Sequence, residues 1–397
     1  MRTRFLEVDT SKGYLLLLGL LGALLAAGLG AAWIMEHHGH HVTGMDNQIV
    51  WGLPHVFAVF LIVAASGALN VASIGSVFGK MPYKPLARLS GLLAIALLAG
   101  GLMILVLDLG RPDRLIVAMT TYNFKSIFAW NIFLYNGFFL IVAAYLWTLM
   151  DHTVSEHAGR VGLFAFVWRL ILTTGTGSIF GFLIAREAYD AAIMAPLFIA
   201  LSLVYGKAIF ILVATGLFRG TGRELDTSLL SRLRVLLGTF IAAALLLTAA
   251  QHLTNLYAAE HLAAEMLILR DGGSITQAFW IGQILLGSLL PMWLLLNPAF
   301  RGHCGALLAA CVLVILGGLA TMYVTIIGGQ SVPLELFPGM EVSSSFFDGE
   351  VIHYAPSLPE LGLGLGGGAL ALLVVLLGVR VLPFLPDALP SSAAADD

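Results

Sequence analysis

Two titratable side chains lie at the ends of long apolar segments, where they could carry proton chemistry. His55 follows Trp51 by one helical turn at the start of one segment, and Asp108 ends the next, three residues before Arg111. Trp130 opens a further segment. If these segments cross a membrane in alternating directions, His55, Asp108, Arg111 and Trp130 share one depth. An imidazole, a carboxylate, a guanidinium and indoles could hold a quinone head group there.

Proton transfer would fall to His55 or Asp108, since either could take the proton released when a quinol is oxidised. Asn131 directly follows Trp130 and adds an amide to the same candidate site. A structural interpretation stays open beside this one. Asp108 and Arg111 are three residues apart, a spacing that also fits an ion pair closing the end of a helix.

Further polar residues lie in or beside other apolar segments. Lys207 falls deep inside one of them, where a charged side chain costs about 3 kcal/mol on insertion scales, so it needs a partner or a wet cavity. A polar line through this part of the chain could carry protons part-way across the membrane. The tentative proton pathway comprises Arg186, Glu187, Lys207, Gln251 and His252.

The composition identifies the elements that must position these residues. Charged residues make up only 11% of the chain, against about 25% in soluble proteins, and hydrophobic residues make up 59%. The apolar runs have the length of membrane helices, not of the alternating strands of a barrel. A net charge of −3 does not indicate the basic surface that binds nucleic acid. Two cysteines are too few to hold an iron–sulfur cluster within this chain.

The sequence therefore predicts an all-α integral membrane protein, because lipid offers backbone amides no partner outside a helix. The first segment has no small-residue cleavage site and is expected to stay as an anchor helix. We predict ten spans, at 14–35, 51–78, 86–109, 126–150, 161–184, 193–218, 232–257, 275–297, 304–328 and 361–384.

The distribution of Lys and Arg predicts the orientation. Placing both termini in the cytoplasm puts thirteen positive residues in inner segments and five in outer ones (Arg111, Arg114, Lys125, Arg186 and Arg270). The segment 329–360 then lies outside, has no Lys or Arg, and carries four acidic residues. We expect a partner to dock on this outer side. The outer acidic residues are Glu335, Glu341, Asp348 and Glu350.

Several features of the sequence give weaker support to other kinds of site. The histidines at 37–41 are more typical of adventitious than of physiological metal binding, so no metal site is predicted. A haem b cytochrome would need facing histidines, and the spans supply only His55 and His252. A secondary transporter would need matched broken helices near the midplane. The haem protein and the transporter remain the alternatives.

Five short motifs occur in a fixed order along the chain. They are Trp51-Gly52, Asp108-x-Gly110-Arg111, Asn123-x-x-Ser126-x-x-x-Trp130, Met194-x-Pro196-Leu197-Phe198 and Tyr354-x-Pro356-Ser357-x-x-Glu360. With these motifs nearly the whole chain resembles the polysulfide reductase membrane subunit (NrfD/PsrC) family. It is most similar to the ten-span, DsrP-type branch, which serves sulfite-reduction-associated complexes in sulfur metabolism.

The resemblance implies two four-helix bundles and a quinone-interacting membrane subunit of an oxidoreductase complex in the bacterial cytoplasmic (inner) membrane. The expected regions are 1–50 (anchor helix and His-rich loop), 51–190 (first bundle, with the quinone site), 191–328 (second bundle) and 329–397 (acidic segment and last span). Menaquinone or ubiquinone would be the bound substrate. A periplasmic ferredoxin-like iron–sulfur subunit would be the partner, with further membrane cytochrome and catalytic subunits. Relatives often have a Tyr before a Gly where this chain reads Ile179-Phe180-Gly181, so Ser178 would supply that hydrogen bond.

Overall fold

The computed structural model describes residues 4–333 and 350–387, and these form an all-α membrane protein as predicted. Ten helices among the described residues are long and apolar enough to span a membrane. They are α1 (Lys12–His38), α2 with α3 (Leu53–Ala68, Asn70–Ser76), η2 with α4 (Met81–Leu86, Ala87–Leu107), α6 (Ile127–Met150), η4 with α7 (Ser155–His157, Ala158–Gly181), α8 (Met194–Gly220), α9 (Thr227–Tyr257), α11 with η7 and α12 (Ser274–Gln277, Ala278–Leu289, Leu290–Leu296), α13 with η9 and α14 (Cys304–Tyr323, Val324–Gly328, Gly329–Ser331), and α15 (Leu358–Val381).

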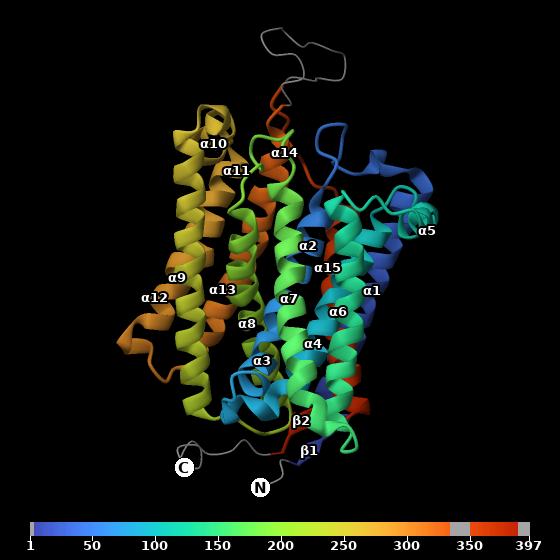
Figure 1. The fold of residues 1–397 in the computed structure, drawn as a ribbon, viewed down its shortest axis with the longest axis vertical. Coiled ribbons are helices and arrows are strands. Elements are labelled where there is room, and N and C mark those ends of the chain that lie inside the picture. The colour runs from blue at the N-terminus through green and yellow to red at the C-terminus, as the bar shows by residue number, and fades with distance from the viewer. Residues whose placement is uncertain (1–3, 334–349, 388–397) are drawn as a thin grey trace.

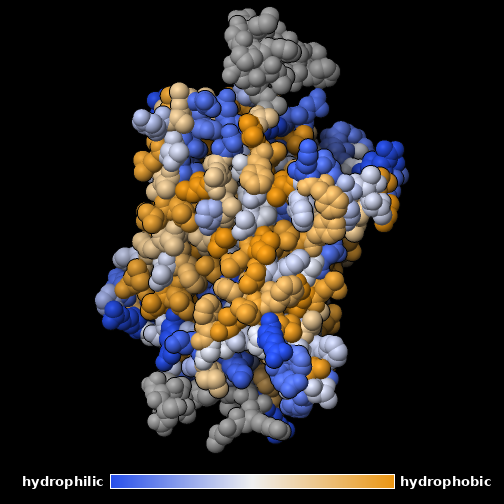
Figure 2. Space-filling view, in the orientation of Figure 1, coloured by the Kyte–Doolittle hydropathy of each residue, from blue (hydrophilic) through white to orange (hydrophobic). Residues whose placement is uncertain are grey.

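The two ends of the described chain meet on one face of the molecule. The short strands β1 (Phe5–Leu6) and β2 (Leu385–Pro386) pair antiparallel there, as an even number of spans requires (Figure 1). We call this the terminal face and the opposite one the distal face. On the side that Figure 2 shows, apolar side chains form a broad belt between hydrophilic ends. The chain is a multi-pass membrane protein.

Close helix packing depends on glycine at several crossings. The first and last spans lie side by side, and a Cβ on Gly28 would lie 2.7 Å from the Cα of Gly366. Helix α2 packs on α4 and equally on α8, where a Cβ on Gly67 would overlap the carbonyl oxygen of Ser202. Backbones can approach this closely only without side chains between them.

The helices group in two sets along the chain. In the first set α2 packs on α4 and α6 on α7; in the second α8 packs on α9, and α13 on η7 and α12. Helix α15 lies against α2 and α4, and α1 packs on α15. Because α2 and α8 pack so extensively, the two sets share one core. The predicted boundaries of the two bundles stay a prediction.

Short helices cover the distal face. The connection after α4 contains η3 (Pro112–Arg114) and α5 (Leu115–Thr120), and η1 (His40–Val42) follows α1. The connection after α9 folds as η5 (Ala259–His261), α10 (Leu262–Met266) and η6 (Leu267–Asp271) (Figure 1). Of the predicted acidic segment, Glu350 is described and exposed. Glu335, Glu341 and Asp348 lie outside the described residues.

Candidate functional site

Helices α2 and α4 bring His55 and Asp108 into contact at the distal face. His55 lies in the first turn of α2, after the helix-starting residues Gly52 and Pro54, and Asp108 caps the end of α4. The Nδ1 atom of His55 is 2.8 Å from the Oδ2 atom of Asp108. The imidazole keeps 20% of its surface exposed, and the carboxylate is fully buried. The predicted catalytic residues therefore form one buried pair.

This contact is close in distance but not aligned as a hydrogen bond. Among the described residues, His55 Nδ1 and both carboxylate oxygens of Asp108 are buried without a hydrogen-bond partner. A buried polar group left unsatisfied costs about 1–3 kcal/mol. The pair thus contains a nitrogen and two oxygens that are buried and whose hydrogen-bonding capacity is not met among the described residues.

Arg111 does not join this pair, and the alternative of an Asp108–Arg111 ion pair was wrong. Arg111 instead donates to Asp113, from Nε to Oδ1 at 3.0 Å and from Nη2 to Oδ2 at 2.9 Å. The hydrogen bond to Asp113 raises the pKa of Arg111, and the same contact lowers the pKa of Asp113. A carboxylate two residues away on the exposed turn offers a bidentate geometry that Asp108, buried behind the helix end, does not offer.

A cluster of aromatic rings begins at the imidazole. Trp51 stacks on His55 with 6.0 Å between ring centroids and 23° between planes. Phe128 and Phe180 meet Trp51 edge-on, at 6.1 and 6.0 Å. Phe180 occupies the position where the resemblance implies a tyrosine, so this wall is apolar. A planar ring could lie against such a wall with its polar edge toward His55 and Asp108.

The start of α2 is held by two segments from the other end of the chain. Oε1 of Gln330 accepts from the backbone N–H of Val50 and of Trp51, each at 3.0 Å, and its Nε2 donates to the carbonyl of Trp51 at 2.9 Å. Tyr354 accepts from the N–H of Leu53 at 2.6 Å. These bonds fix the backbone that carries Trp51 and His55.

Tyr354 and Glu360 form the second support of this segment. The Tyr354 hydroxyl donates to Oε1 of the fully buried Glu360 at 2.5 Å, and Oε2 accepts from the N–H of Gly44 at 2.9 Å. Burial and the bond to Glu360 raise the pKa of Tyr354. A Cβ on Gly52 would overlap the Glu360 carboxylate, which explains the glycine. The motif from Tyr354 to Glu360 therefore positions the candidate site.

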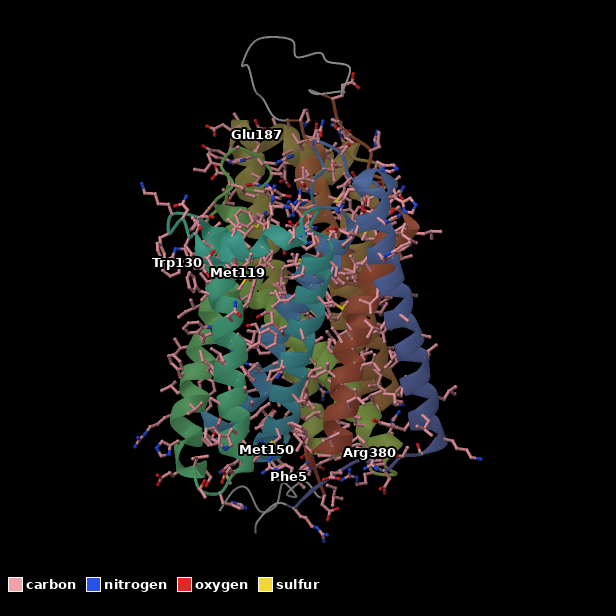
Figure 3. The ribbon with its side chains drawn as sticks, turned by 90° about the vertical axis from the view of Figure 1, so that its right-hand side faces the viewer. Phe5, Met119, Trp130, Met150, Glu187 and Arg380 are labelled. Atoms are coloured by element: carbon pink, nitrogen blue, oxygen red, sulfur yellow. The ribbon has the colours of Figure 1, made fainter. Side chains whose placement is uncertain are left out.

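The remaining residues of the predicted quinone site lie apart from the pair. Trp130 is 48% exposed at the side of the molecule, and its indole N–H donates to the carbonyl of Phe124 at 2.9 Å (Figure 3). Asn131 donates to the carbonyl of Gly175 at 3.1 Å and so joins α6 to α7. Ser178 is buried in α7. Within the described residues, no hydrogen bond or ion pair joins these three to His55 or Asp108.

Two residues of the tentative proton pathway belong to the distal connections. The guanidinium of Arg186 donates to the carbonyl of Gln330 at 3.0 Å and to that of Gln48 at 2.8 Å, and burial lowers its pKa. The backbone carbonyl of Glu187 accepts from His261 Nδ1 at 2.5 Å, and Figure 3 shows Glu187 at the distal end. In these contacts Arg186 and Glu187 join connecting segments to one another.

The second helix set contains another buried histidine–carboxylate pair. Nδ1 of His252 is hydrogen-bonded to Oε1 of Glu265, and Asn255 donates to Oε2 of the same carboxylate at 3.3 Å. Glu265 is 1% exposed and comes from α10. Gln251, one residue before His252, contacts the sulfur of Met194 at 3.7 Å. Glu265 was not predicted from the sequence, where its signal was a single acid among the apolar residues of 262–269.

Lys207 lies near the middle of α8 and is fully buried, as its sequence position implied. The partner that such a position requires is Asn70, whose Oδ1 accepts from Nζ at 3.3 Å. Arg169 in α7 is also buried, with Nε and Nη1 unpaired among the described residues. No role was predicted for Arg169 from the sequence. Two cations near mid-span thus lie buried in neighbouring helices.

The ten spans and the buried site define a multi-pass membrane protein with titratable groups just inside one face. The polysulphide reductase, NrfD family matches residues 41–333, and the chain belongs to this family. The chain is 28% identical over 396 residues to the Hdr-like menaquinol oxidoreductase integral membrane subunit of Archaeoglobus fulgidus, covering 98% of each chain.

Two further relatives match most of the chain. A selenate reductase subunit of Mesobacillus selenatarsenatis is 25% identical over 406 residues, covering 92% of this chain and 93% of the relative. The menaquinone reductase integral membrane subunit of Nitratidesulfovibrio vulgaris is 25% identical over 391 residues, covering 91% and 89%. The finer assignment to the DsrP-type branch stays a prediction.

Proposed function

We propose that this chain is the quinone-interacting membrane subunit of a respiratory redox complex. It exchanges electrons between membrane quinol or quinone and an iron–sulfur subunit on the distal face. The observation that carries this proposal is the buried His55–Asp108 pair, which keeps unused hydrogen-bonding atoms beside the Trp51 ring. Family membership and the names of two relatives, which specify menaquinol and menaquinone, support it and favour menaquinone over ubiquinone.

Quinol oxidation gives one quinone, two protons and two electrons. In the proposed site the two quinol hydroxyls donate in turn to the His55–Asp108 pair, which takes each proton as general base and releases it before it takes the next. The 20% of His55 that is exposed gives each proton a way out on the distal side. The two electrons would pass one at a time to iron–sulfur clusters of the partner subunit, since the chain is proposed to hold no haem or iron–sulfur group itself. In the reverse direction the pair supplies the two protons in turn.

The two alternative functions receive less support from the described residues. A haem bridged by His55 and His252 would need the two rings to face each other, whereas His55 stacks on Trp51 in the first helix set and His252 packs on Phe279 in the second. A transporter would need charged residues facing a path at mid-membrane, whereas the mid-span Lys207 is fully buried and bonded to Asn70. The redox function accounts for the pair at the distal face, and the alternatives do not.

The orientation and the partners are part of the same proposal. We infer that the distal face is periplasmic and the terminal face cytoplasmic, in a bacterial cytoplasmic membrane, because, of the positive residues outside mid-span that the structure describes, twelve lie toward the terminal face and five toward the distal face. A ferredoxin-like subunit would dock beside η1 and α5. Further membrane cytochrome and catalytic subunits, as in sulfur-metabolising complexes, would complete the assembly.

A hydroxyquinoline N-oxide titration of the purified complex tests the proposal. We expect saturable quenching in the wild type, lost in His55→Ala and kept in His252→Ala, which removes an equally buried histidine from the second pair. An absorption spectrum of the purified chain should show no Soret band. Equal binding by both variants, or a haem spectrum that disappears with either histidine, would overturn the proposal.

Proton translocation by the second helix set is a separate proposal that rests on Lys207. The single hydrogen bond from Nζ to Asn70 leaves two ammonium N–H groups without a partner among the described residues. The tentative pathway through Arg186, Glu187, Gln251 and His252 remains a prediction. In proteoliposomes that oxidise quinol, Lys207→Ala should lower the protons released per electron. An unchanged ratio would contradict this role and leave the quinone proposal intact.

A further inference from the structure

A cavity of about 460 Å³ lies at the terminal face, on the opposite side of the molecule from the His55 site. The ends of α8 and α12 and the beginnings of α9 and α13 enclose it. In Figure 1 the turn between α12 and α13, which contains η8 (Pro298–Phe300), projects beside the lower end of α9. Its size falls within the range of about 300–1,000 Å³ that is usual for small-molecule sites.

The lining of this cavity is strongly positive. Arg219, Arg234 and Arg301 line it together with His303, against a single carboxylate, Glu224. Within residues 4–333 and 350–387 none of the three arginines forms an ion pair; the five ion pairs found there involve other residues. Three guanidinium groups around one space favour an anion, and planar guanidinium suits the oxygens of a phosphate.

Arg234 is built into the wall of the cavity. Its guanidinium donates to the carbonyls of Leu295 at 2.6 Å, of Leu294 at 2.5 Å and of Phe300 at 2.5 Å. These carbonyls end α12 and begin the projecting turn, so Arg234 fixes the wall while its charge stays unbalanced. Arg219 and Arg301 are exposed at the membrane surface and can turn toward a ligand.

A buried hydroxyl gives an independent sign of a polar ligand. Thr215 lines the cavity and is only 4% exposed, and its Oγ1 has no hydrogen-bond partner among the described residues. It lies one helical turn deeper in α8 than Arg219, on the same side of the helix. A hydroxyl at this place can donate to an oxygen of an anion held by the arginines above it.

The cavity also has an apolar side that opens laterally. Val235 and Leu296 line it and are 57% and 51% exposed on the belt that faces lipid, and Leu230 and Leu307 lie further inside. Figure 2 shows hydrophilic side chains at the lower end of the molecule directly beneath this apolar belt. The binding of a free phosphate does not require such an opening, whereas an acyl chain could pass through it.

We propose that this cavity binds the head group of an anionic phospholipid from the leaflet on the terminal side. The phosphate lies between Arg219 and Arg301, Thr215 donates to one of its oxygens, and an acyl chain leaves between Val235 and Leu296. Basic pockets between membrane helices are suited to such head groups. The lipid would add a further link between the four helix ends around the cavity, and this role does not depend on the quinone site.

Native mass spectrometry of the full chain in detergent, titrated with phosphatidylglycerol or phosphatidylcholine, tests the proposal. We expect phosphatidylglycerol to bind preferentially, and Arg219→Gln and Arg301→Gln each to weaken its binding about tenfold, the loss of one charge-assisted contact. Arg232→Gln removes an exposed charge from the same face without altering the cavity lining and should bind as the wild type does. Equal binding of both lipids, or equal binding by all variants, would overturn the proposal.

Two further measurements make the outcome independent of variant folding. Cys304 lines the cavity and Cys311 is buried, so alkylation of wild-type protein reports on the cavity. Phosphatidylglycerol should slow alkylation of Cys304 several-fold, and phosphatidylcholine should not. If inorganic phosphate protects Cys304 equally well and the lipid adds nothing, the ligand is a free anion and the lipid assignment is wrong.

Discussion

The part of the chain that the structure describes contains two buried histidine–carboxylate pairs near the distal face, and their surroundings differ. In the pair of His252 and Glu265, both carboxylate oxygens are hydrogen-bonded, one to the imidazole and one to Asn255. In the pair of His55 and Asp108, the same kind of contact leaves both carboxylate oxygens and Nδ1 without an aligned partner. The His252–Glu265 pair is complete in itself, whereas the His55–Asp108 pair has hydrogen-bonding capacity left for a ligand.

The aromatic neighbours of the two histidines sharpen this difference. The ring of His252 meets Phe279 edge-on at 4.7 Å, as in an ordinary helix interface. The ring of His55 stacks on Trp51, whose edge-on neighbours Phe128 and Phe180 extend an apolar wall. A buried histidine–carboxylate pair alone therefore does not identify a site. The unfilled hydrogen bonds and the stacked Trp51 ring distinguish His55 and Asp108.

The largest effect is expected from Asp108→Asn. Because the amide cannot take a proton, quinol oxidation by the intact complex should fall about 10²–10⁴-fold, the usual contribution of a general base. Steady-state oxidation of a soluble menaquinol analogue measures this. Asp113→Asn, which removes a carboxylate from the exposed turn nearby, serves as the control. A rate within a few-fold of the wild type in Asp108→Asn would show that Asp108 is not the base.

A substitution in the His252–Glu265 pair, the second pair, should lower the stability of the protein and not its affinity for the inhibitor. Glu265→Leu leaves His252 and Asn255 buried without their acceptor, and breaking a buried pair costs about 3–5 kcal/mol. We expect a clearly lower thermal unfolding midpoint with unchanged affinity for the quinol-site inhibitor in the fraction that stays folded. Asp271→Asn, at an exposed pair with Arg270, should leave the midpoint unchanged. Loss of inhibitor affinity in folded Glu265→Leu would mean that the two pairs do not have separate roles.

A smaller effect should follow from loosening the support of the first pair. Tyr354→Phe removes the acceptor of the Leu53 N–H and one donor to Glu360, so the start of α2 can shift. We expect inhibitor affinity to fall about tenfold, equivalent to roughly 1.4 kcal/mol. Tyr323→Phe, which alters a neighbouring ring without touching that hydrogen bond, is the matched control. Equal affinity in both variants would show that this support is not needed.

The smallest effect is expected at the exposed pair of Arg111 and Asp113. The bond to Arg111 lowers the pKa of Asp113, so the pair contributes above the ordinary pKa of an aspartate and is lost as pH falls through the lowered value. At neutral pH it is therefore fully formed, yet it is exposed and screened. Arg111→Gln should leave inhibitor binding unchanged from pH 6 to 8. A change in inhibitor binding between pH 6 and 8 would show that Arg111 contributes to the quinone site.

The sequence predicted the fold better than the site, for physical reasons. Ten apolar runs of membrane-spanning length leave only helices possible, and the described residues confirm them. The common depth of His55 and Asp108 followed from the order of spans, but their contact depends on how α2 packs on α4. The expected pairing of Asp108 with Arg111 was wrong because a nearer carboxylate, Asp113, offered better geometry.

Other parts of the site could not be predicted from local sequence. Gln330 and Glu360 support the start of α2 from positions 279 and 316 residues further along the chain, distances that no helical pattern encodes. Arg186 was expected in a proton path, yet it binds two backbone carbonyls, a role open to any buried guanidinium. Glu265 was missed because a single acid in a short loop helix gives no periodic signal.

Photolabelling would locate the quinone site on the chain itself. An azido-quinone applied to the purified complex and mapped by peptide mass spectrometry should label the peptides that contain Trp51 to His55 or Asp108, and a hydroxyquinoline N-oxide should prevent this labelling. We expect no competed label on the peptide that contains His252 and Glu265. Competed labelling of that second peptide, with none around His55, would contradict the assignment of the quinone to the first pair.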